Sequence, residues 1–326
     1  TVVVCMFFAA ISGSAVATVS AVGAFMIPEM VKHGYSKSYS AALTAAAGTI
    51  GVIIPPSIPF VIYGVVSGTS ITGMFTAGFL PGILMGVALM VVNYIVSKKY
   101  GYKGSERTEK SSGILKTFMD AFWAILSPVI ILGGIYSGKF TPTEAAVVSV
   151  VYSFIIGVFV YKELDMKGAY KAFKDAIVVN GATTFMIGLS TAFAALLTME
   201  QIPLKIASII TGMSNNGIII LLLINILLII IGMFIDNIPA TIILTPILLP
   251  ICMSYGMHPI TFGIMLTMNL AIGFCTPPYG INLFVASAIS KVKMEDLSKQ
   301  IMLMIFALIV VLMLVTFIKP LTMIFI

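Results

Sequence analysis

The sequence predicts an all-α polytopic membrane protein that contains two copies of one helical arrangement. Of its 326 residues, 60% are hydrophobic and only 9% are charged, whereas a soluble domain carries about 25% charged residues. Most of the lysines gather in connectors between long apolar runs, and a few polar breaks interrupt the runs themselves. A water-soluble fold could not bury this much apolar surface, so we expect the lipid bilayer to be the solvent for most of the chain.

A series of landmarks near the start of the chain recurs in the same order later on. The segment 12–18 aligns with 235–241 at an offset of 223, and later landmarks align at 222: Ile27-Pro28 with Leu249-Pro250, Gly34 with Gly256, and Pro55-Pro56 with Pro277-Pro278. An ordered series of this length rarely arises by chance. It therefore predicts an internal repeat.

Each copy is expected to contain a helical hairpin with a polar tip, followed by a helix that is broken in the middle. The tips are 12–14 and Asp236-Asn237, and the breaks are the two Pro-Pro pairs, where proline removes a backbone donor and disrupts the helix. Within a membrane, backbone groups without hydrogen bonds are tolerated only where they are buried in protein or line a cavity. Paired interruptions in two halves of a chain mark the binding site of a transporter.

Lysine positions predict how the spans are oriented, because loops rich in lysine and arginine stay in the cytoplasm. Two such connectors, 97–112 and 161–175, flank two expected spans, so both connectors are placed inside. Counting outward from them, the first hairpin opens to the cytoplasm and the second opens to the other side, so the repeats are inverted. The other expected elements are spans at 82–96, 113–136, 140–160 and 180–199, a broken helix at 39–66, an interfacial amphipathic helix at 163–178, and a short segment near the outer face at 202–213.

We expect residues 1–112 to form the C-terminal part of the first inverted repeat, with hairpin, broken helix, one span and a basic loop. Residues 113–326 form the complete second repeat, with scaffold spans, an amphipathic arm helix, hairpin, broken helix and last span. The chain begins inside a hydrophobic segment, at Thr1. From the repeat offset we expect roughly 110 further residues upstream.

Several long motifs resemble the large membrane subunit of TRAP (tripartite ATP-independent periplasmic) transporters. They span most of the chain: SGSAVAT at 12–18, GTIGVIIPPS at 48–57, GGIYSGKFTPTE at 133–144, FIDNIPAT at 234–241 and GFCTPPYGIN at 273–282. The resemblance implies an elevator-type carrier of the ion transporter superfamily kind, in the bacterial inner membrane. It also implies sodium-driven import of organic acid anions such as C4-dicarboxylates or sialic acid, with a small membrane subunit (separate or fused) and a periplasmic binding protein as partners.

The resemblance further implies sodium ions at the two hairpin tips and the adjacent broken helices, and no other cofactor. Carried over by motif, the expected cation ligands are Ser12, Gly13, Ser14, Gly48, Pro55, Asp236, Asn237, Gly273 and Thr276. The expected substrate contacts are Pro56, Ser57, Pro277 and Asn282. Elementary chemistry points to the same places, because hard cations prefer oxygen ligands and half-helix N-termini suit anions.

Some of these residues also have a structural explanation. Asp236 could serve as a helix N-cap, and an uncharged residue would do that at a smaller desolvation cost in an apolar region. Ser12 and Ser14 could instead allow close helix packing, and Asn282 could form helix–helix hydrogen bonds. Thr276 has no symmetric partner, because the first copy has Ile54 there.

Two other features are expected to be structural. Thr141-Pro142-Thr143-Glu144 has the spacing of a helix capping box. The three cysteines, Cys5, Cys252 and Cys275, lie in apolar segments without metal-ligand spacing, so we expect them to pack in the interior.

Three alternative functions are considered. A purely structural membrane subunit would not need two symmetric breaks in its helices. An intramembrane aspartyl enzyme would need two facing carboxylates, and only Asp236 lies deep in an apolar segment. The sequence also contains neither a zinc-protease nor a serine-hydrolase motif. A stand-alone sodium–carboxylate symporter of similar architecture, without a binding protein, stays open.

Overall fold

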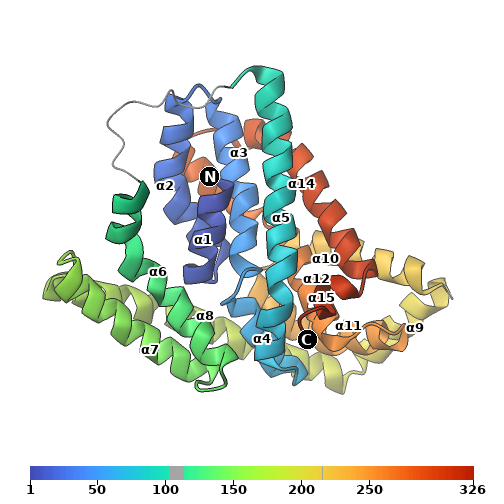
Figure 1. Cartoon of the computed structure of the whole chain (residues 1–326). Coiled ribbons are helices and arrows are strands. Elements are labelled where there is room, and N and C mark those ends of the chain that lie inside the picture. Colours follow the sequence, from blue (N-terminus) through green and yellow to red (C-terminus); the bar gives the residue numbers. More distant parts are fainter. Residues whose placement is uncertain (103–113, 215) are drawn as a thin grey trace. The chain divides into compact units, whose positions relative to one another are not determined.

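The computed structural model describes residues 1–102, 114–214 and 216–326 (Figure 1). Within those ranges the regular structure is helical, without β-strands, and eight helices are long and apolar enough to cross a membrane. These findings confirm the predicted all-α, polytopic class. The chain divides into two compact units, Thr1–Gly104 with Ser190–Ile326 and Ser105–Leu189, and each is considered by itself.

The first unit holds both hairpins and both broken helices. Its first-copy helices are α1 (Val2–Ser12), α2 (Ala15–Lys32), α3 (Lys37–Gly48), the short 3-10 helix η1 (Thr49–Val52), α4 (Ile58–Ser67) and α5 (Ile71–Tyr100). Its later helices are α9 (Ile202–Met213), α10 (Gly217–Phe234), α11 (Asn237–Ser254), α12 (Pro259–Gly273), α13 (Ile281–Ser290), α14 (Met294–Phe317) and α15 (Pro320–Met323). The α12 helix is buried from Ile260 to Gly273 and forms the centre of the unit together with α3.

The helix bounds reproduce the repeat seen in the sequence. The α2 and α11 helices begin and end 222 residues apart, and α4 and α13 begin and end 223 residues apart. One detail of the sequence alignment was wrong. Ser14 and Asp236 both precede their helices as N-caps, so the structure pairs these two residues, whereas the motif alignment had paired Gly13 with Asp236.

The starts of α3 and α12 lie at opposite ends of this unit. The turn before α3 lies beside the end of α5, where the Tyr35 and Ser97 hydroxyls are 3.0 Å apart. In the second copy, the start of α12 lies beside α4, whose Tyr63 hydroxyl donates to the Pro259 carbonyl at 2.6 Å. Because α5 leads away from the end of α4, these two contacts lie at opposite ends of the unit. Inverted copies would place the starts of α3 and α12 in this way, and the inverted repeat with its boundary at residue 112 stays a prediction.

Helix boundaries follow local capping chemistry. Ser36, Ser57 and Ser70 each accept a backbone N–H of the first turn that follows them. The α5 helix is longer than the expected span at 82–96, because Ser70 caps it and the helix begins at Ile71, eleven residues earlier. The short segment 202–213 forms α9, which packs against α10 and α11, and its predicted place near the outer face stays a prediction.

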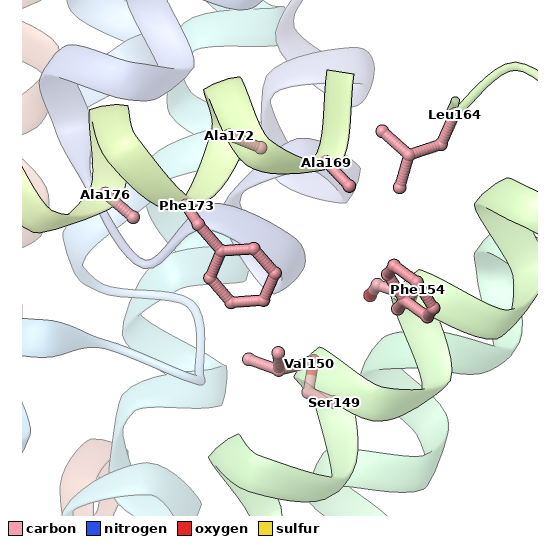
Figure 2. Close-up of a pocket in the computed structure, with 9 residues that line it drawn as sticks. Ser149, Val150, Phe154, Leu164, Ala169, Ala172, Phe173 and Ala176 are labelled. Atoms are coloured by element: carbon pink, nitrogen blue, oxygen red, sulfur yellow. The ribbon is translucent and has the colours of Figure 1, made fainter. Parts of the chain in front are cut away.

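The second unit consists of α6 (Ile114–Tyr136), α7 (Pro142–Ile155) with a π-helical turn at Ile156–Val160, and the first part of α8 (Met166–Met199). The capping box at the start of α7 is present as predicted, with Glu144 Oε2 accepting from the Thr141 backbone N–H at 2.8 Å. An apolar cavity of about 310 Å³ lies between α7 and α8, and Phe173 points across it toward Val150 and Phe154 (Figure 2).

The α8 helix corrects one expectation. The sequence predicted an interfacial helix at 163–178 and a separate span at 180–199, but the structure has a single helix of 34 residues. The boundary was inferred from the change from lysine-rich to apolar composition. The junction contains no proline, and Gly181 alone does not interrupt the helix, because an isolated glycine costs only about 1 kcal/mol.

Candidate functional site at the two hairpin tips

The first hairpin tip contacts the first Pro-Pro break directly. Gly13 ends α1 with a left-handed φ of 62°, and a side chain there would lie 2.7 Å from the Pro56 carbonyl oxygen. The Gly13 carbonyl accepts the Ile58 backbone N–H at 3.3 Å. Only glycine fits this combination of backbone angle and close approach. The start of α2 and the start of α4 are therefore brought together.

Hydroxyl groups surround this first tip. Ser14 caps α2 through the Ala17 backbone N–H, and Ser12 Oγ lies 3.0 Å from Thr18 Oγ1. The Thr18 hydroxyl donates to the Ser14 carbonyl at 2.8 Å. Across the break, the buried Ser57 hydroxyl donates to the Val52 carbonyl at 2.6 Å. The site thus offers uncharged oxygen atoms at the predicted positions.

The second tip contacts the second break through Gly232, which lies one helical turn before the polar residues Asp236 and Asn237. A side chain at Gly273 would overlap the backbone of Gly232, near the end of α10. The Met233 carbonyl then accepts the Gly280 backbone N–H at 3.4 Å. These contacts hold the end of α10 beside the broken region 274–280.

Asp236 and Asn237 form the polar part of this tip. Asp236 Oδ1 accepts the Asn237 backbone N–H at 2.6 Å, which makes it the N-cap of α11. Asn237 is 2% exposed, its Oδ1 accepts the Thr241 hydroxyl at 3.3 Å, and its Nδ2 has no partner among the described groups. A buried amide nitrogen without a partner is unfavourable, so this tip has unused hydrogen-bonding capacity.

Carbonyl groups without donors precede each Pro-Pro pair. In the second copy, Gly273 and Phe274 carbonyls accept the Thr276 and Asn282 backbone N–H groups, but no described group donates to those of Cys275 and Thr276. The equivalent residues of the first copy, Ile53 and Ile54, also lack a donor to their carbonyls in the described part of the chain. All four residues are at most 9% exposed. The same pair of buried acceptors therefore occurs in both copies.

Four helix N-termini lie at these two regions. The α2 and α4 helices start at the first, and α11 and α13 start at the second. Helix N-termini carry a partial positive charge and unpaired N–H groups, which favour anions. The two regions are connected, because α13 packs against α2 and α3, and α4 packs against α11.

Asn282 joins the two copies. Its Nδ2 donates to the Ala45 carbonyl of α3 at 3.2 Å, and its buried Oδ1 has no partner among the described groups. The helix–helix hydrogen bond anticipated for this residue is therefore present.

Several predicted ligands already have structural contacts of their own. The Asp236 carboxylate accepts the Asn237 backbone N–H. Thr276 donates its hydroxyl to the Ile272 carbonyl at 2.7 Å. Gly48 lies against Val19 and the Ala15 carbonyl, so its missing side chain serves close packing of α3 on α2.

Some polar residues near these regions were not among the predicted ligands. Thr18 and Thr241 contact the two tips, and each ends its tip motif, which was a usable signal, although the helix starts pair Thr18 with Ala240. A buried network behind the second tip was also missed: Asn225 Oδ1 accepts Asn269 Nδ2 at 2.8 Å and the Thr316 hydroxyl at 3.4 Å. The three cysteines are free and buried, as predicted.

Comparison with known proteins identifies the family. The family model for "Tripartite ATP-independent periplasmic transporter, DctM component" matches residues 1–321. The chain is 48% identical over its full length to the isethionate TRAP transporter permease protein DctMQ of Oleidesulfovibrio alaskensis, covering 51% of that protein. It is 37% identical to the sialic acid TRAP transporter permease protein SiaT of Haemophilus influenzae, with 95% of the chain and 50% of that protein aligned.

A third relative is the C4-dicarboxylate TRAP transporter large permease protein DctM of Pseudomonas aeruginosa, 41% identical over 97% of the chain and 74% of that protein. The chain thus spans about half the length of the first two relatives. The family comprises transport components rather than enzymes, which confirms the expectation that the chain is a transport protein and not an enzyme. The described part of the chain holds eight candidate spans, and with the family assignment this makes the protein a multi-pass protein of the inner membrane. The chain belongs to the family of the DctM component, the large permease of TRAP transporters.

Proposed function

We propose that this chain is the transport core of a sodium-coupled importer of small organic acid anions. One cation would bind at each hairpin tip, between the tip and the neighbouring Pro-Pro break. The observation that carries the proposal is the matched pair of buried carbonyls without donors, Ile53 and Ile54 in one copy and Cys275 and Thr276 in the other. Sodium is a hard cation that prefers oxygen ligands, and broken helices in transporters supply such carbonyls.

Side chains of the tips would complete the two coordination shells. The first tip offers the hydroxyls of Ser12 and Ser14 together with backbone around Gly13, and the second offers the Asp236 carboxylate. Gly48, Pro55, Asn237, Gly273 and Thr276 would contribute backbone or support at these sites. The carboxylate fits this role because an unpaired ionised group in an apolar region needs a compensating charge.

The substrate would be an anion held between the two regions. The N-termini of α2, α4, α11 and α13 supply positive potential there. The Oδ1 atom of Asn282, with Pro56, Ser57 and Pro277, would shape the site. The names of the relatives cover a sulfonate, a sialic acid and C4-dicarboxylates, which supports small organic anions as the class, with a carboxylate or sulfonate group.

The partners we propose are a small membrane subunit and a periplasmic binding protein that delivers the substrate. The family assignment supports both. We further propose that the unit with the two hairpins moves as one body during transport. Its dense internal packing, with α3 and α12 at the centre, supports this elevator-type motion.

Transport in liposomes tests the proposal. The full-length permease, with its small subunit and binding protein, is reconstituted and supplied in turn with isethionate, succinate or N-acetylneuraminate. Uptake of one of them should require an inward sodium gradient and should not require ATP. Equal uptake with choline in place of sodium, at fixed membrane potential, would contradict the proposal.

The alternative is a stand-alone sodium–carboxylate symporter of similar architecture. The same liposomes distinguish the two, because the alternative predicts sodium-driven uptake without the soluble component. Uptake that appears only when the binding protein is added favours the tripartite importer.

A further inference from the structure

A small cavity between α5 and α14 lies away from the proposed transport site. Its volume is about 240 Å³, and it is lined by the end of α5 and the start of α14, with Tyr39 of α3 behind them. The two long helices pack side by side within the first unit (Figure 1). They are corresponding helices of the two repeats, so the cavity combines residues about two hundred positions apart in the sequence.

Two lysines line this cavity, one from each copy of the repeat. Lys99 belongs to the last turn of α5, and Lys299 lies in the second turn of α14. Lys99 Nζ is 5.7 Å from the centre of the Tyr100 ring. No described carboxylate lies within 4 Å of either ammonium group, although Glu295 and Asp296 begin α14. Two cations therefore converge without a described anionic partner.

The rest of the lining combines an apolar wall with a few polar groups. Val92 and Met304 are buried, while Ile95 and Leu303 are 53% and 48% exposed. The other polar groups are those of Tyr100, Gln300 and Tyr39, whose hydroxyl donates to Asn93 Oδ1 at 3.0 Å. A ligand for this surface would need a negative group next to an apolar chain.

We propose that the cavity binds an anionic phospholipid. The phosphate would lie between Lys99 and Lys299, and an acyl chain would follow Ile95 and Leu303. Basic pockets between membrane helices bind anionic lipid headgroups, and lysines near the surface add to the attraction. The end of the unit that holds Lys99 and Lys299 also holds the turn before α3, which matches the predicted cytoplasmic side.

Native mass spectrometry of the intact permease in detergent tests the site. The protein is titrated with phosphatidylglycerol, phosphatidylcholine or glycerol phosphate. Phosphatidylglycerol should bind most tightly. Lys99→Gln combined with Lys299→Gln should weaken it by about 25-fold, since each lysine contributes about fivefold. Glycerol phosphate should bind poorly, because it lacks the chain that contacts the apolar wall.

Matched variants separate the cavity from general surface charge. Lys98→Gln with Lys293→Gln removes the same two charges from the ends of the same helices, but neither residue lines the cavity. This variant should retain phosphatidylglycerol, and so should Lys99→Arg with Lys299→Arg. Equal losses in the cavity and control variants, or equal binding of both lipids, would overturn the proposal.

A photo-crosslinking amino acid at Leu303 identifies the occupant in the native membrane. A lipid adduct supports the proposal. A protein adduct would overturn it, because the cavity would then be covered by another subunit or by another part of the full-length protein.

Discussion

The two hairpin tips share one backbone arrangement but differ in chemistry. In both, a half-helix ends, a capping residue follows and a new helix begins beside a Pro-Pro break. The cap is Ser14 in the first tip and Asp236 in the second. The repeat therefore preserves the free carbonyls of both breaks and places a charged group at only one of them. We expect the second tip to dominate the electrostatics of ion binding.

The helices behind the tips differ as well. The second copy contains the buried Asn225–Asn269–Thr316 network, whereas the first has Ala47 at the position that corresponds to Asn269. Polar groups within the membrane hold helices together. The second hairpin is thus anchored by hydrogen bonds and the first by close packing.

The largest structural effect is expected from Gly273→Ala. The added methyl group would overlap the Gly232 backbone and separate α10 from the break. We expect a loss of about 3 kcal/mol in stability, measured as thermal unfolding in detergent. The matched control is Gly133→Ala in α6, where a methyl group meets nothing within 4 Å. Equal unfolding temperatures for wild type and Gly273→Ala would refute the tight contact.

Asn225→Leu tests the anchoring of the second hairpin. It leaves one donor of Asn269 and the Thr316 hydroxyl without this acceptor, so we expect a loss of about 2 kcal/mol. Replacing both Asn225 and Asn269 by leucine should recover much of that loss, because the unpaired Asn269 donor is then gone and the Thr316 hydroxyl keeps its bond to the Leu312 carbonyl. If the double variant is the less stable of the two, the network is not the cause.

Ser14→Ala tests the first tip. It removes the cap on the Ala17 backbone N–H and should lower stability by about 1 kcal/mol, whereas Ser14→Gly should cost only a few tenths. Its effect on the sodium dependence of uptake should be small, about threefold at most. A sodium requirement raised as much as by a change at Asp236 would remove the proposed difference between the tips.

Glu144→Gln should have the smallest effect. Its carboxylate caps α7 in the second unit, outside both tips, and glutamine can serve at the same position. We expect nearly wild-type uptake and a stability change below about 0.5 kcal/mol. Complete loss of uptake in a normally inserted protein would assign Glu144 a function beyond capping.

Much of the fold could be predicted from local chemistry. Pro55-Pro56 and Pro277-Pro278 interrupt helices wherever they occur, and the Thr141–Glu144 box fixes a helix start by itself. The length of α8 could not be predicted, because its change in composition at about residue 179 carries no helix-breaking residue. The pairing of Ser14 with Asp236 also required the structure, since helix starts rather than residue types define it.

The site could also be predicted only in part, because local motifs identify some of its residues while helix crossings bring the others together. Gly13 and Pro56 meet because the motifs that contain them meet. The bond from Asn282 to Ala45 depends on how α13 crosses α3, which the sequence of neither helix specifies. Thr18 was passed over because a threonine inside a helical segment resembles ordinary packing.

The most direct test of the account is a sodium titration of uptake for wild type and Asp236→Asn in the same liposomes. Asparagine keeps the size and can still cap α11, but it removes the charge. The account predicts a normally inserted protein that needs at least about tenfold more sodium for half-maximal uptake. Overlapping titration curves would contradict it and leave Asp236 as a helix cap alone.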